Sequence, residues 1–90
     1  MTYIKLGTVH AFPRVAPDKA HALKPLEEAA EVFGAWQHRD SDEVLDEIAD
    51  TIQACCNLAA ALGVDDLTPY LARCEERNRE RGRYGEGEPK

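Results

Sequence analysis

Apolar side chains recur every three or four residues over two long stretches, a period that places them on one face of a helix. The first stretch predicts a helix over residues 24–38, led in from Asp18, with the apolar face Leu26, Ala29, Ala30, Phe33 and Trp36. The second predicts a helix over residues 42–62 with the stripe Val44, Leu45, Ile48, Ile52, Cys55, Ala59 and Leu62. A shorter helix is expected over residues 68–81, with the buried residues Tyr70, Leu71 and Cys74.

Capping residues divide these helices. Asp40 or Ser41 is suited to begin the second helix, and Gly63 to end it. Thr68 followed by Pro69 is a typical start for the third, with Thr68 as the N-cap. A short link between two long amphipathic helices places them side by side and antiparallel. The predicted fold is therefore all-α, a helical hairpin plus a third helix.

The rest of the chain is divided by prolines and glycines. Residues 1–17 contain two prolines and predict an extended arm, with a short strand in the alternating run 3–9. Residues 18–81 form the helical domain, and residues 82–90 are Gly-rich and charged, as expected of a flexible tail. A lone strand would have to pack on a neighbour or pair with another subunit.

Composition narrows the possible functions. With 90 residues the chain is one small domain, and its short length favours completing a four-helix-type bundle by oligomerisation. Its 11 basic and 17 acidic residues give a net charge of −6, which argues against nonspecific nucleic-acid binding. No apolar run spans a membrane and no signal-peptide pattern opens the chain. The three cysteines suit a reduced cytoplasmic protein in which they act as small core residues.

Acidic residues repeat one spacing on the two long helices. Glu28 and Glu31 lie three apart on the first, as do Glu47 and Asp50 on the second. Residues three apart share a helix face, and both pairs adjoin apolar positions. In an antiparallel hairpin that turns near residues 39–41 the two pairs come level. We therefore expect four carboxylates at the seam between the helices.

Four crowded carboxylates repel one another, and divalent cations relieve that repulsion. Mg²⁺, or Mn²⁺, prefers oxygen ligands and keeps positions open for water and phosphate. The competing interpretation is a solvated acidic face, which the matched positions of the pairs make less favourable. A di-iron centre would need a His three residues after a Glu, and the chain has none.

Further polar residues lie on the same helices. Asn57, two turns after Asp50, suits either a substrate contact or an ordinary surface amide, with equal weight. Lys24, one turn before Glu28, is placed to meet a phosphate, although a plain surface lysine is nearly as good an interpretation. Arg77 and Arg81 suit either phosphate binding or the dipole at a helix C-terminus.

Together these motifs resemble the MazG-like nucleotide pyrophosphohydrolases of the all-α NTP pyrophosphatase superfamily. The resemblance spans residues 23–84 and rests on Lys24-x-x-Glu27-Glu28-x-x-Glu31, Glu47-x-x-Asp50, Asn57 and Arg77-Asn78-x-x-Arg81. It implies Mg²⁺ held by Glu28, Glu31, Glu47 and Asp50. It implies hydrolysis of nucleoside triphosphates to monophosphate and pyrophosphate, in homodimers or homotetramers. The residues implied to contact substrate are Asn57, Arg77, Asn78 and Arg81.

Two alternative functions, an open choice of general base and two departures from the family pattern accompany this resemblance. Phosphoribosyl-ATP pyrophosphohydrolases fit almost as well, but the chain lacks their Ser-Tyr-Thr segment and has Gln53-Ala54 where they have Tyr-His. A helical interaction module without turnover is the alternative of another class. For water attacking the α-phosphorus, Glu27 or Glu28 is the candidate general base. Pro25 and the arm 1–17 depart from the family pattern.

Overall fold

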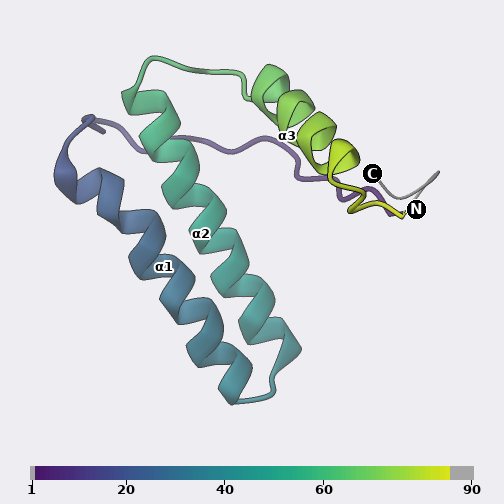
Figure 1. Cartoon of the computed structure of the whole chain (residues 1–90). Helices are drawn as coiled ribbons and strands as arrows, with labels where there is room; N and C mark the ends of the chain where they lie inside the picture. Colours follow the sequence, from purple (N-terminus) through teal and green to yellow (C-terminus); the bar gives the residue numbers. More distant parts are fainter. Residues whose placement is uncertain (1, 86–90) are drawn as a thin grey trace. The chain divides into compact units, whose positions relative to one another are not determined.

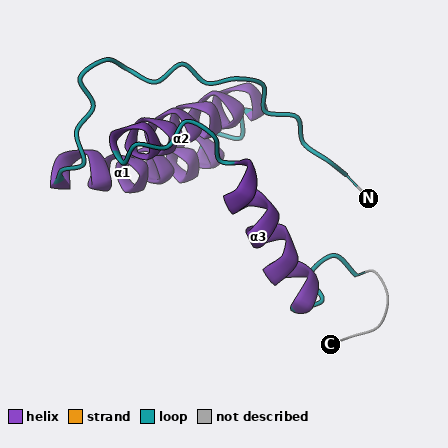
Figure 2. Cartoon of the chain, turned by 90° about the horizontal axis from the view of Figure 1, so that it is seen from above, coloured by secondary structure: helices purple, strands orange, loops and turns teal. Residues whose placement is uncertain are grey.

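The computed structural model describes residues 2–85, and this span contains three helices and no strand (Figures 1 and 2). The predicted all-α class is therefore confirmed. The short strand expected in residues 3–9 is wrong, because this segment has no regular secondary structure. A single strand with no partner leaves its backbone groups unpaired, so an irregular segment is the outcome for the isolated chain. Residues 86–90 of the expected tail lie outside the described residues.

The chain falls into two compact units, each described by itself. One is Gly7–Val64, and the described part of the other comprises residues 2–6 and 65–85. Helices α1 (Lys19–Gln37) and α2 (Ser41–Ala61) belong to the first unit, and α3 (Thr68–Glu80) belongs to the second. None of the described helices combines the length and the apolar composition that a membrane crossing requires.

Side-chain caps fix the starts of α1 and α2. The Asp18 carboxylate accepts a hydrogen bond from the His21 backbone N–H at 2.9 Å, and Asp40 accepts one from the Glu43 N–H at 3.2 Å. Both bonds satisfy amides that have no partner inside the helix. Helix α1 continues through Pro25, so the separate lead-in expected before residue 24 is part of one helix.

A tight turn joins α1 to α2. Arg39 has the left-handed backbone conformation, with φ 58°, between the last turn of α1 and the cap of α2. His38 Nδ1 lies 3.0 Å from a carboxylate oxygen of Glu43 and links the two helix ends. The helices then run antiparallel, side by side (Figure 1).

Helix α3 begins at the residue expected, but the capping role predicted for that residue is wrong. Thr68 is its first residue rather than its N-cap, and the Asp66 carboxylate accepts the Thr68 backbone N–H at 2.9 Å. The burial predicted for this helix is wrong, because Tyr70, Leu71 and Cys74 are all exposed. Among the described residues of its own unit α3 is the one helix, so that part of the unit offers no second helix against which to bury an apolar face.

The seam between α1 and α2 combines small and polar residues with a few aliphatic ones, and it contains neither Phe33 nor Trp36. Ala35 and Ala54 are the buried apolar residues, at 3% and 5% exposure. Half-buried positions continue the seam along each helix at spacings of three and four: His21, Pro25, Glu28 and Val32 on α1, and Val44, Glu47, Thr51 and Leu58 on α2. These spacings are those of two helices packed along their length.

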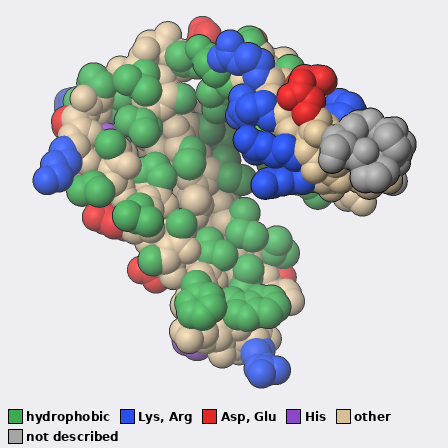
Figure 3. Space-filling view, in the orientation of Figure 1, with side chains coloured by type: hydrophobic (Ala, Val, Ile, Leu, Met, Phe, Trp, Pro, Cys, Tyr) green, Lys and Arg blue, Asp and Glu red, His purple; other side chains and the backbone are tan. Residues whose placement is uncertain are grey.

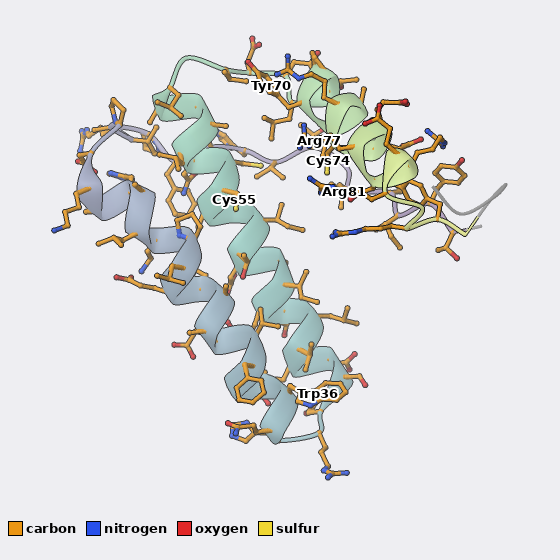
Figure 4. All side chains as sticks on the ribbon, viewed as in Figure 1. Trp36, Cys55, Tyr70, Cys74, Arg77 and Arg81 are labelled. Atoms are coloured by element: carbon orange, nitrogen blue, oxygen red, sulfur yellow. The ribbon has the colours of Figure 1, made fainter. Side chains whose placement is uncertain are left out.

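The large apolar side chains lie on a neighbouring face of the hairpin, which we call the outer face. It comprises Leu26, Phe33 and Trp36 of α1 with Leu45, Ile48, Cys55 and Leu62 of α2, all exposed. Green side chains cover much of the hairpin in Figure 3, and Trp36 lies beside its turn in Figure 4. The predicted burial of these residues is therefore wrong for the single chain, as is the prediction that Cys55 is a core residue. One residue along a helix is a rotation of about 100°, so apolar positions adjacent to the seam face away from it.

Candidate functional site

Three carboxylates from the two seam helices come together in the hairpin unit. Oxygens of Glu28 from α1 and of Glu47 and Asp50 from α2 all lie within 4.8 Å of one another. Glu28 and Glu47 are half-buried in the seam, and Asp50 is exposed. The antiparallel hairpin brings Glu28 of α1 level with Glu47 of α2, and the three-residue spacing puts Asp50 one turn from Glu47. We call these three residues the acidic cluster.

The acidic cluster carries a strong local negative potential. The pKa of Glu47 is raised, first because partial burial removes water from its carboxylate and then because the charge of Asp50 repels its own. Glu31 and Glu28 contribute smaller repulsions of the same sign. A carboxylate whose ionisation is opposed by its neighbours gains from a cation placed among them.

The donor set fits a hard divalent cation. Every donor in the acidic cluster is a carboxylate oxygen, the ligand type that Mg²⁺ and Mn²⁺ prefer. Mg²⁺–oxygen distances of about 2.1 Å place opposite ligands of one ion about 4.2 Å apart. Oxygens already within 4.8 Å therefore need only small side-chain movements to share an ion.

Glu31 stands apart from the other three predicted ligands. It lies near enough to Glu47 for its charge to contribute to the raised pKa of that residue. It is exposed, however, and it is not one of the three carboxylates that lie within 4.8 Å of one another. The structure thus brings together three of the four carboxylates that the spacing predicted.

Lys24 forms ion pairs with Glu27 and Glu28, the two candidate general bases. Its Nζ lies 3.5 Å from a carboxylate oxygen of Glu27 and 3.5 Å from one of Glu28. The carboxylates of Glu27 and then Glu28 raise the pKa of Lys24. The Glu27 side chain is 62% exposed and the Glu28 side chain 21%, so only Glu28 points into the seam.

Asn57 is engaged by the N-terminal arm. It is 8% exposed, and its carboxamide oxygen accepts hydrogen bonds from the Phe12 backbone N–H at 2.9 Å and from Gln53 Nε2 at 3.0 Å. Gln53 Nε2 also donates to the His10 carbonyl at 2.9 Å. Sequence reasoning singled out Asn57 but did not predict that Gln53 and the arm bond to each other and to Asn57. Two amides four residues apart on α2 were the available signal, because such a pair shares one face.

Of the residues predicted to contact substrate, Arg77 and Asn78 lie on α3 and Arg81 follows it directly. Figure 4 labels the two arginines. Arg77 and Arg81 are one turn apart, and the Asn78 amide lies 3.6 Å from the Cys74 sulfur. Arg79, between them, turns to the other side and pairs with Glu75 at 3.2 Å. Arg79 therefore pairs with a carboxylate of its own helix, whereas Arg77 and Arg81 lie on a different side of the helix.

Comparison with known proteins gives one family. Residues 9–78 match the family model described as phosphoribosyl-ATP pyrophosphohydrolase, a span that includes the acidic cluster, Asn57 and Arg77 but not Arg81. No curated protein and no solved structure gives a match. The matching family is the sister family that the sequence placed second, inside the expected superfamily. The superfamily prediction is therefore confirmed.

Proposed function

We propose, because this chain belongs to the phosphoribosyl-ATP pyrophosphohydrolase family, that it hydrolyses the α–β phosphoric anhydride of phosphoribosyl-ATP. Water adds at the α-phosphorus, the bond to the bridging oxygen breaks, and pyrophosphate leaves. The observation that carries this proposal is the acidic cluster, which falls inside the matched span. Carboxylates crowded in the seam lower the stability of the folded chain unless a cation is bound among them.

The acidic cluster is the proposed metal site. Glu28, Glu47 and Asp50 would hold Mg²⁺ or Mn²⁺, with Glu31 next to them. When bound, the cation would offset charge on the phosphate oxygens and lower the pKa of a bound water. Helices α1 and α2 would hold the three carboxylates in place, so that the site is formed before substrate binds.

Glu27 is the proposed general base. It lies beside Glu28 but outside the acidic cluster, and its exposed carboxylate remains available to accept a proton. Lys24 holds Glu27 and Glu28 on either side of its ammonium group, which supports a role in orienting both and in meeting a substrate phosphate. Arg77, Asn78 and Arg81 are proposed to bind further phosphate oxygens, for which guanidinium groups are well suited.

The outer face supports a homodimer or homotetramer. Leu26, Phe33 and Trp36 are each more than 60% exposed in the single chain. A contiguous apolar face of this kind is usual for an interface and unusual for a monomer surface. Two hairpins joined through it would complete a four-helix bundle with the proposed metal sites at its seams.

Ordinary nucleoside triphosphates are the second candidate substrates, as in MazG-like enzymes. The observation that favours them is the dipeptide Gln53-Ala54, which stands where the sister family has Tyr-His. In this chain Gln53 binds the arm and Ala54 is buried in the seam. Neither residue is available for the role that Tyr-His would serve.

Pyrophosphate release tests the proposal. The wild type is assayed with phosphoribosyl-ATP, ATP and a panel of other nucleoside triphosphates, with Mg²⁺, with Mn²⁺ and with EDTA. The proposal predicts metal-dependent release with phosphoribosyl-ATP as the preferred substrate. Preference for another triphosphate would establish the second candidate. No release from any substrate by folded, metal-loaded protein would contradict both and leave the helical interaction module.

A further inference from the structure

The N-terminal arm is fixed to α2 at one place within the hairpin unit. The backbone at Phe12 donates to Asn57, the carbonyl of His10 accepts from Gln53, and the two amides bond each other. Asn57 is the buried polar residue among those described. The arm has no secondary structure of its own, so these long-range hydrogen bonds determine its course past α2 (Figure 1).

The fixed segment lies at a definite distance from the acidic cluster. Gln53 is one turn after Asp50 on α2, and Asn57 is two turns after it. The rise of 1.5 Å per residue separates Asp50 and Asn57 by about 10 Å along the helix. A nucleotide whose phosphates meet the acidic cluster extends its ribose and base over a comparable length. The arm therefore lies where the base end of a substrate could reach it.

Phe12 gives this segment a surface for a flat ring. Its backbone N–H is held at 2.9 Å by Asn57, yet its side chain is 58% exposed. A large aromatic ring on an anchored backbone pays little ordering entropy when a second ring stacks on it. Stacking on aromatic side chains is the general way in which proteins bind the faces of nucleobases.

We infer that residues 10–12 form the base-binding end of the substrate site, with Phe12 as the ring that stacks on the nucleobase. Gln53 and Asn57 are positioning residues that hold this segment beside α2 and do not touch the substrate. The inference rests on the proposed function and adds to it the part of the site that meets the base.

Two substrates that share the α–β anhydride, one with a nucleoside and one without, test the inference. Phosphoribosyl-ATP carries the adenine ring, whereas methyl triphosphate has the same α–β anhydride without ribose or base. Phe12→Ala should lower kcat/KM for phosphoribosyl-ATP by roughly 5- to 150-fold, the range equivalent to one lost stacking contact. It should leave kcat/KM for methyl triphosphate unchanged. Tyr3→Ala, which removes another exposed aromatic ring from the arm, is the matched control and should change neither value.

The positioning role has its own variants. Asn57→Ala removes the acceptor for the Phe12 N–H and should reproduce the base-selective loss, mainly as a higher KM. Asn57→Asp keeps an oxygen at that position and should restore part of it. Gln53→Ala supplies an independent test if Asn57→Ala does not fold, as judged by circular dichroism. An equal loss for both substrates would mean that the arm serves stability alone and would overturn the inference.

A binding measurement keeps the inference testable apart from catalysis. AMP is titrated into the wild type, Phe12→Ala and Tyr3→Ala without metal and followed by calorimetry. Weaker AMP binding in Phe12→Ala alone supports the inference even if no triphosphate is cleaved, in which case only the proposed function fails. Equal AMP binding by all three proteins, or unchanged kcat/KM in Phe12→Ala, overturns it.

Discussion

The seam of the α1–α2 hairpin is more polar than its outer face, the reverse of what a hairpin with its own hydrophobic core would show. The seam, where two helices meet, contains small residues and the carboxylates of Glu28 and Glu47. The outer face, which the single chain leaves exposed, carries Phe33 and Trp36. In a hairpin stabilised by its own core the large apolar residues would fill the seam. The contrast is the basis for proposing that the seam binds a cation and that the outer face stabilises an assembly.

This division explains how a chain of 90 residues accommodates a charged seam. The ionised carboxylate of Glu47 opposes folding, as its raised pKa indicates. A small domain has little core to offset that cost. Apolar area gained by joining two outer faces would offset it without placing a large side chain in the site.

The outer face gives the largest expected effect. If Phe33 is buried between subunits, Phe33→Ala should lower the free energy of unfolding by about 3–5 kcal/mol at concentrations where the wild type is assembled. Urea denaturation at several protein concentrations measures this, and the wild-type midpoint should rise with concentration. Asp46→Ala, at an exposed polar position of α2, should stay within about 0.5 kcal/mol.

A wild-type unfolding midpoint that does not change with protein concentration would contradict the stabilising role proposed for the outer face. In that case Phe33→Ala would behave like Asp46→Ala, and the outer face would be ordinary exposed surface. The stability of the hairpin would then have to come from the seam alone.

The seam gives the next effect. Glu47→Gln should lower metal-dependent pyrophosphate release about a hundredfold or more, because it removes one ligand charge. The same change should stabilise the metal-free protein at neutral pH. The raised folded-state pKa means that the contribution of Glu47 is fully present below its unfolded-state pKa and is lost as pH rises through the folded value.

Urea denaturation in EDTA across this pH range shows which of the two proteins has the larger free energy of unfolding at each pH. Wild type and Glu47→Gln should converge in acid, and the variant should be the more stable at neutral pH. Glu80→Gln, a carboxylate at the end of α3, is the control and should show no such divergence. A variant that is less stable than the wild type at neutral pH would contradict the electrostatic account of the seam.

The turn between the helices gives the smallest effect. Arg39 has a left-handed φ of 58°, which costs energy for any residue with a Cβ. Arg39→Gly should therefore raise the free energy of unfolding by about 0.5–1 kcal/mol. Ala30→Gly, at an exposed position inside α1, should lower it by about 1 kcal/mol. Loss of stability in both variants would mean that Arg39 contributes a contact that outweighs its backbone strain.

The sequence predicted the helices and the closeness of three carboxylates more reliably than it predicted burial. Caps at Asp18 and Asp40 and the apolar period located α1 and α2 to within a few residues, except at Pro25. Periodicity identifies an apolar face but not the neighbour that covers it, so the exposure of Trp36 in the single chain was not predictable.

The acidic cluster was predictable because spacing and hairpin geometry act together on Glu28, Glu47 and Asp50. The fixing of the arm by Gln53 and Asn57 was not, because it joins residues more than forty positions apart without a repeated pattern. Long-range contacts of irregular segments leave little trace in local sequence.

The central claim is that the seam of the hairpin holds a divalent cation. A crystal grown with Mn²⁺ and measured at an anomalous wavelength tests it most directly. The account predicts an anomalous peak about 2.0–2.2 Å from oxygens of Glu28, Glu47 and Asp50. Mn²⁺ bound elsewhere with these three carboxylates turned toward bulk solvent would contradict it.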